Sequence, residues 1–129
     1  MVLDSSAVIA IILDEPEHDR FSHMVADADV RMMSAASVLE TCVVLESRAG
    51  EAAGREFELF LVEAEIQIMT VDRTQVEAAK VAWRQYGKGR HCAALNLGDC
   101  FVYALAKIKG EPVLAKGNDF TLTDIPMCV

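Results

Sequence analysis

Short apolar segments alternate with longer amphipathic segments along this chain, and this alternation constrains the fold more than any other feature. The segments that fit strands are residues 1–4, 30–34, 66–71 and 112–115. The segments that fit helices are residues 6–13, 17–28, 38–49, 51–64, 72–86 and 99–109. Strands that are separated by helices pair in parallel, because each connection must cross over one face of the sheet. The sequence therefore predicts an α/β fold, a three-layer α/β/α sandwich with a mostly parallel central sheet.

The helical segments show both amphipathic spacing and end signals. Residues 51–64 place Phe57, Phe60 and Leu61 on one face. The segment 72–86 carries apolar residues at helical spacing, namely Val76, Ala79, Trp83 and Tyr86. A glycine follows three of the segments, at Gly50, Gly87 and Gly110, where glycine commonly ends a helix. The chain of 129 residues is a one-domain length, so we expect a single domain over residues 1–129.

The composition does not favour a membrane or secreted protein. The longest unbroken apolar stretch, Ala7 to Leu13, is far shorter than the ~20 residues of a membrane-spanning helix. Acidic residues, Asp4 and then Asp14, stand where a secretory signal carries positive charge. The chain has four cysteines, at Cys42, Cys92, Cys100 and Cys128, and no two of them have CxxC spacing. We therefore expect reduced thiols and a cytoplasmic protein.

The charge balance argues against nucleic-acid binding unless metal ions intervene. The formal net charge is −8, whereas phosphate affinity normally comes from lysine and arginine. Carboxylates that hold divalent cations remove this objection, because the bound ions reverse the local charge. The alternative is a non-catalytic acidic module that binds a basic partner protein. The apolar fraction of 53% exceeds the ~45–50% of ordinary soluble domains, so we expect a homodimer or a bound partner to cover part of the surface.

Acidic residues are predicted to gather beyond the carboxyl ends of the strands, where parallel sheets bind ligands. Asp4 and Asp119 follow the first and the last strand. Glu40 lies in the helix after the second strand, and Asp99 begins the helix before the last one. Each acid also has a structural alternative. Asp4 and Asp99 suit helix ends, Ser37 with Glu40 matches a capping box, and Asp119 suits a turn.

These acids and their neighbours resemble the PIN-domain family, and within it the toxin ribonucleases of the VapBC toxin–antitoxin modules. The resemblance rests on segments that follow in order along the chain, at residues 1–7, 34–40, 86–91, 95–101 and 116–120. They read MVLDSSA, SAAS with Glu40, YGKGRH, LNLGDCF and KGNDF. Ser5 stands where the family often has threonine, and Ala115 stands where many members are bulkier. Neither departure removes an acid.

The resemblance implies a metal-dependent endoribonuclease that a cognate VapB-like antitoxin holds inactive. Asp4, Glu40, Asp99 and Asp119 match the acidic residues of the family, and we call them the acidic quartet. Such oxygen ligands suit Mg²⁺ or Mn²⁺, and we expect Asp4 and Asp99 to hold the tighter ion. Glu40 and Asp119 would complete the site or orient water. Attack by a metal-activated water predicts products with 5′-phosphate and 3′-hydroxyl ends.

Other residues near these acids receive weaker predictions. Lys88, Arg90 and His91 either hold the RNA backbone or form a solvated charged loop. Ser5 and Ser6 either support Asp4 by hydrogen bonding or cap the first helix.

Two further alternatives concern partner binding and reaction class. The Phe57 face of the helix at 51–64 either packs in the core or docks an antitoxin segment. A phosphatase with an aspartyl nucleophile is disfavoured, because Ser6 stands where such enzymes have a second aspartate.

Overall fold

The computed structural model describes residues 1–129 and confirms the α/β fold. The strands are β1 (Val2–Leu3), β2 (Met32–Ser34), β3 (Gln67–Met69) and β4 (Val113–Leu114). The helices of the amino-terminal half are α1 (Ser5–Ile12), α2 (His18–Asp27), α3 (Ala35–Ala49) and α4 (Glu51–Glu63). The helices α5 (Arg73–Tyr86) and α6 (Leu97–Lys109) follow, and a short 3₁₀ helix, η1 (Phe120–Leu122), lies after β4.

The central sheet has the strand order β3-β2-β1-β4, and every pair of neighbouring strands is parallel. Val2 lies opposite Met32 on one side and opposite Val113 on the other. The chain builds the sheet outward from β1 through β2 to β3, and it then returns to add β4 on the other side of β1. The strand order therefore reverses between β1 and β4, which is where open parallel sheets form ligand crevices.

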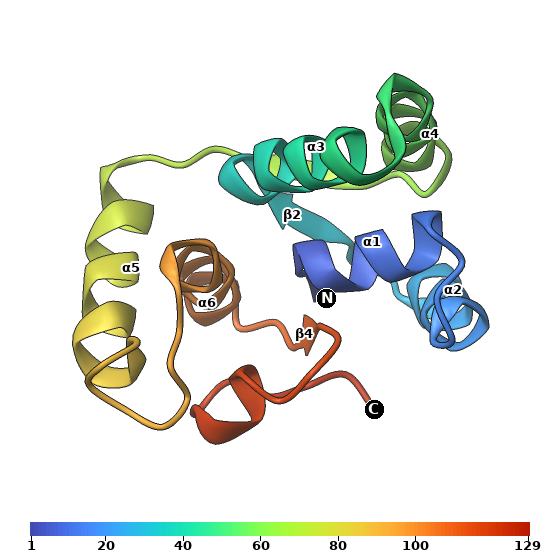
Figure 1. Cartoon of the computed structure of the whole chain (residues 1–129). Helices are drawn as coiled ribbons and strands as arrows, with labels where there is room; N and C mark the ends of the chain where they lie inside the picture. Colours follow the sequence, from blue (N-terminus) through green and yellow to red (C-terminus); the bar gives the residue numbers. More distant parts are fainter.

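Neighbouring residues of β1, β2 and β4 point to opposite faces of the sheet and into two different cores. Leu3, Met33 and Leu114 pack with the apolar faces of α1, α2, α3 and α4. Their neighbours pack with α5 and α6, and they are Val2, Met32 and Val113. Figure 1 shows α5 and α6 on one side of the sheet and α1, α2, α3 and α4 across it. The three-layer sandwich is confirmed. None of its helices combines the length and apolarity needed to cross a bilayer.

Two helices begin two or more residues earlier than the sequence pattern predicts. Helix α3 begins at Ala35, because the Ser34 side chain accepts a hydrogen bond from the Ala36 amide at 3.3 Å. The predicted capping box of Ser37 with Glu40 is therefore wrong. Helix α6 begins at Leu97 instead of Asp99, because an asparagine one residue earlier caps it. The apolar pattern located each helix body, whereas the polar caps fix where each helix starts.

The strands are shorter than predicted. The second strand ends at Ser34 as predicted but begins at Met32, and the other three strands are shortened at both ends. Val30, expected in the second strand, lies outside it and is 40% exposed. The Phe57 face of α4 faces the core, where Phe57 and Leu61 are buried and Phe60 packs at its margin. Core packing is thus confirmed for this face, and its predicted alternative as an antitoxin dock is wrong.

Candidate metal centre

Asp4 joins the ends of the neighbouring strands β1 and β4. Its amide donates to the Leu114 carbonyl at 2.9 Å, so its backbone continues the pairing of β1 with β4. Its carboxylate Oδ2 accepts hydrogen bonds from the Ser6 amide, at 2.9 Å, and from the Ser6 hydroxyl. The same hydroxyl accepts from the Lys116 amide at 2.9 Å. The prediction that Ser6 supports Asp4 is confirmed, and this contact also anchors the segment after β4.

Asp99 is held in the first turn of α6 by a capping box with Asn96. Its Oδ2 accepts from the Asn96 amide at 3.0 Å, and its own amide donates to Asn96 Oδ1 at 2.9 Å. Asp99 is 8% exposed and Asp4 is 5% exposed. The helix-end alternative is thus correct for both acids. These hydrogen bonds use Oδ2 in each case, and a carboxylate has a second oxygen that can bind a cation.

Glu40 projects from α3 toward the starts of α1 and α6. Ser5 donates its hydroxyl hydrogen bond to Glu40 Oε1 at 2.7 Å. The side chain of this serine therefore supports Glu40, and the prediction that it supports Asp4 is wrong. A methyl group at Gly98 would overlap Glu40 Oε2 and would lie only 3.0 Å from Oε1. The missing side chain at position 98 therefore leaves room for the Glu40 carboxylate beside Asp99.

Asp119 is the fourth member of the acidic quartet. It lies in the exposed segment between β4 and η1 and acts on the other members through its charge. Burial is the largest cause that raises the pKa of Asp99; together with the charges of Asp4, Asp119 and Glu40, and against the lowering effect of the Asn96 hydrogen bond, it brings this pKa to about 6. Burial also raises the pKa of Asp4, with a smaller contribution from Glu40. The four carboxylates therefore repel one another across one end of the sheet.

No member of the acidic quartet forms an ion pair with a lysine, an arginine or a histidine. Buried carboxylates without a cationic partner are costly, and metal coordination is one of the ways in which proteins offset that cost. Their oxygen-only chemistry fits Mg²⁺ or Mn²⁺. In the structure no three carboxylate, histidine or cysteine side chains already stand close enough to enclose an ion.

The raised pKa of Asp99 predicts how the metal-free protein responds to pH. The pKa in the folded state, about 6, lies above that of an unfolded aspartate, so folding favours the protonated form. This residue therefore lowers the free energy of unfolding as the pH rises from about 4 to about 6. In chelator, Asp99→Asn should be more stable than wild type at about pH 7.5, with a smaller gain at about pH 4.5. Urea unfolding measures both, and an equal gain at the two pH values would contradict the prediction.

The predicted RNA-contacting residues lie in the loop between α5 and α6. Lys88 and Arg90 are exposed, and the Arg90 guanidinium lies 4.1 Å from the ring centre of Trp83. His91 accepts a hydrogen bond from the Ala93 amide at 3.0 Å and packs edge-on against Tyr86. His91 thus has a structural role within the loop, whereas neither Lys88 nor Arg90 forms an ion pair with an acid.

Lys116 is a residue of this region that the sequence pattern does not reveal. Its ammonium group pairs with Glu15 at 3.2 Å and with Glu17 at 3.3 Å, which tethers the segment before Asp119 to the connection between α1 and α2. The partners are about a hundred positions away in sequence, and only the parallel pairing of β1 with β4 brings them together.

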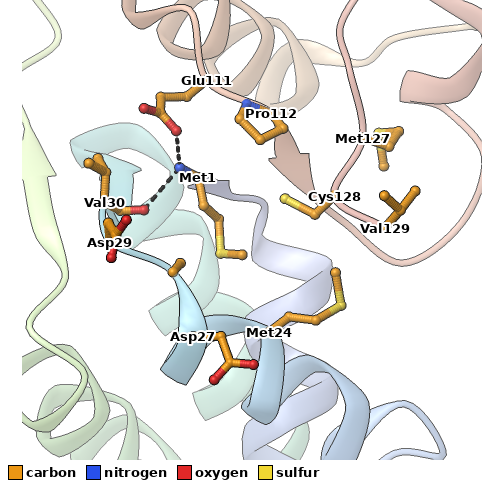
Figure 2. Close-up of a pocket in the computed structure, with 11 residues that line it drawn as sticks. Met1, Met24, Asp27, Asp29, Val30, Glu111, Pro112, Met127, Cys128 and Val129 are labelled. Carbon is orange, nitrogen blue, oxygen red and sulfur yellow. Dashed lines mark hydrogen bonds and ion pairs between the residues drawn. The ribbon is translucent and has the colours of Figure 1, made fainter.

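A cavity of about 590 Å³ lies at the opposite end of the sheet from the acidic quartet. It is bordered by residues that precede β1, β2 and β4, including Met1, Val30 and Pro112 (Figure 2). The Met1 amino group contacts Glu111 and donates to the Val30 carbonyl at 2.9 Å. This large cavity is thus not the candidate metal centre. The candidate centre is identified instead by the position of the acids at the carboxyl ends of the strands.

Comparison with known proteins gives relatives over nearly the whole chain. A ribonuclease VapC of Mycolicibacterium smegmatis is 54% identical over 125 residues, covering 97% of this chain and 97% of that protein. Ribonuclease VapC30 of Mycobacterium tuberculosis is 52% identical over 125 residues, covering 97% of this chain and 95% of that protein.

Solved structures of low sequence identity share the fold. The Mycobacterium tuberculosis toxin VapC20, described as cleaving the sarcin-ricin loop, superimposes with a TM-score of 0.82 at 18% identity. That match covers 98% of this chain and 97% of the VapC20 chain. A chain of a toxin-antitoxin complex from Klebsiella pneumoniae gives a TM-score of 0.67 at 16% identity, covering 92% of this chain and 88% of that one.

The family model of the PIN domain matches residues 1–126. This match spans the whole sheet and every member of the acidic quartet, from Asp4 after β1 to Asp119 after β4. The chain belongs to the PIN domain family.

Proposed function

We propose that this chain is the toxin of a type II toxin–antitoxin system and acts as a divalent-metal-dependent endoribonuclease. The observation that carries the proposal is the pair of buried carboxylates, Asp4 and Asp99, which lie at the switch point of the sheet without any cationic partner. Relatives that are 52–54% identical bear the name ribonuclease, which supports the reaction class.

The members of the acidic quartet form two pairs with different roles in the proposed site. Asp4 and Asp99, fixed through Oδ2 by their helix ends, would hold the tighter Mg²⁺ or Mn²⁺ ion. Glu40 and Asp119 would complete the shell or orient water, with Ser5 setting the starting position of Glu40. The bound ion would supply positive charge to the scissile phosphate and activate a water for in-line attack. Water attack leaves the ribose 2′-hydroxyl unused.

The test is cleavage of total RNA by the purified chain with Mg²⁺, with Mn²⁺ and with chelator. We expect cleavage only with metal, and fragments that carry 5′-phosphate and 3′-hydroxyl ends. Mapping both ends distinguishes this route from transfer to the 2′-hydroxyl. Cyclic phosphate ends, or cleavage that survives the chelator, would overturn the proposal.

The exposed cations of the loop between α5 and α6 should contribute to RNA affinity. We expect Lys88→Ala and Arg90→Ala each to weaken binding, and to reduce the slope of log affinity against log salt by about 0.7 to 1. Filter binding over a range of salt concentrations measures this slope. Lys109→Ala, at the far end of α6, is the matched control and should leave the slope unchanged. Equal slopes in all variants would show that the loop does not contact phosphate.

We further propose a cognate VapB-like antitoxin as partner and a homodimer as the working assembly. A toxin-antitoxin complex among the structural relatives supports the first proposal. Exposed apolar side chains on α3 and α4 support the second, and they are Leu39, Val43, Leu59 and Val62. Because RNA and the antitoxin would meet the chain in the cytoplasm, we propose that compartment for the protein.

A further inference from the structure

Trp83 does not behave as a core residue. It is 45% exposed, and it belongs to neither of the two core clusters that fill the faces of the sheet. It is also the only tryptophan of the chain. A large aromatic side chain held at the surface commonly serves a binding site, where its flat apolar face contacts a ligand.

Trp83 borders an open pocket of about 470 Å³ between α5 and α6. The walls are mainly apolar and include Val76, Leu95, Leu97 and Phe101, while Lys80 and Lys88 provide positive charge. Leu97 is 77% exposed although it belongs to this wall. Asn96 also lines the pocket, and it is the residue that caps α6 and bonds to Asp99. One residue of the pocket wall is therefore hydrogen-bonded to a member of the acidic quartet.

Two contacts hold the indole ring in place. Any side chain at Gly87 would collide with the Trp83 carbonyl and with the edge of its ring, so the glycine backbone packs directly against the indole. The Arg90 guanidinium lies over the ring, 4.1 Å from its centre. A ring that is already ordered loses little conformational entropy when a ligand stacks on it.

The charge around the pocket is opposite to that of the rest of the chain. Two cations and no acid line the pocket: Lys88, and Lys80, which also pairs with Glu77 at 3.2 Å. The whole chain, in contrast, has a net charge of −8. Such a local reversal favours an anionic ligand, and it opposes the docking of a second copy of the same basic face.

We propose that this pocket binds a nucleobase of single-stranded RNA next to the scissile phosphate, with the base stacked on Trp83. The proposal rests on the ribonuclease function proposed above and names a substrate subsite for it. Lys80 and Lys88 would contact the flanking phosphates, and the apolar walls would exclude water from the base. Trp83 is thus a substrate-positioning residue beside the acidic quartet.

The single tryptophan makes its intrinsic fluorescence a direct probe of stacking. The wild-type chain in chelator, which prevents metal-dependent cleavage, is titrated with a short single-stranded RNA and with an abasic oligomer of equal length. The base-bearing RNA should quench the fluorescence in a saturable way, whereas the abasic oligomer should not. Equal quenching by both oligomers would overturn the proposal, because phosphate contact alone would then explain the signal.

Substitution separates stacking from folding. We expect Trp83→Ala to weaken RNA binding by about tenfold to a hundredfold, and Trp83→Phe to restore most of the affinity because it keeps an aromatic face. In cleavage assays Trp83→Ala should raise KM with little change in kcat. Unchanged RNA affinity in Trp83→Ala, with or without loss of a dimer in sedimentation, would overturn the subsite. Base-dependent quenching by a wild-type chain that cleaves no RNA would instead refute the ribonuclease and leave the subsite standing.

Discussion

Asp99→Asn and Asp4→Asn should each lower the rate of RNA cleavage by about a thousandfold or more at saturating metal. Each change removes one negative charge from a buried carboxylate that would bind the ion, while it keeps the shape of the side chain. The amide oxygen of asparagine can still accept the hydrogen bond that each aspartate accepts at its helix end. The loss should therefore appear in a protein that folds normally, as judged by circular dichroism and urea unfolding.

Asp124→Asn is the matched control for these two variants. Asp124 accepts hydrogen bonds from Tyr103 and Lys107, both at 2.6 Å, and it is not a member of the acidic quartet. Removing its charge should lower the free energy of unfolding, because the contacts with Tyr103 and Lys107 are weakened. The rate of RNA cleavage should stay within a few-fold of wild type. If Asp99→Asn or Asp4→Asn cleaved RNA as fast as Asp124→Asn, the proposed metal site would be wrong.

Gly98→Ala should lower cleavage by about tenfold to a hundredfold without destabilising the protein. The new methyl group would occupy the space of the Glu40 carboxylate, which must then swing away from Asp99. Gly98 lies within α6, where alanine is favoured over glycine by up to about 1 kcal/mol. The expected result is thus a chain that is equally stable or more stable, and less active.

The control for this change is Gly54→Ala in α4. There too the added methyl group would crowd a glutamate, Glu46, at 2.9 Å, but in a part of the surface that no member of the acidic quartet lines. It should raise stability in the same way and leave cleavage unchanged. Full activity in Gly98→Ala would show that the position of Glu40 beside Asp99 is not needed for the reaction.

The sequence predicted the layers and the acids because both follow from local pattern. Asp4 comes directly after an apolar strand, and Asp99 comes just after the start of an amphipathic helix, so parallel topology brings them to one edge. The starts of α3 and α6 were missed because Ser34 and Asn96 stand outside the apolar periodicity. The role of Ser5 was missed because Glu40, its partner, lies 35 positions away.

The pocket at Trp83 was not predictable from helical spacing. Val76, Ala79 and Trp83 recur as one apolar face, which suggests burial, but only Ala79 of the three is buried. Helix α5 lies at the margin of the sandwich and packs against α6. Sequence periodicity identifies an apolar face, whereas the extent of its burial depends on the neighbouring element.

The most direct test of the account is a titration of the purified chain with Mn²⁺, followed by the electron paramagnetic resonance signal of the free ion. We predict saturable binding that Mg²⁺ displaces and that weakens as the pH falls below about 6, the pKa of Asp99. The double variant Asp4→Asn/Asp99→Asn should lose this binding while it remains folded. Undiminished Mn²⁺ binding in that variant, or none in the wild type, would contradict a metal centre built on the acidic quartet.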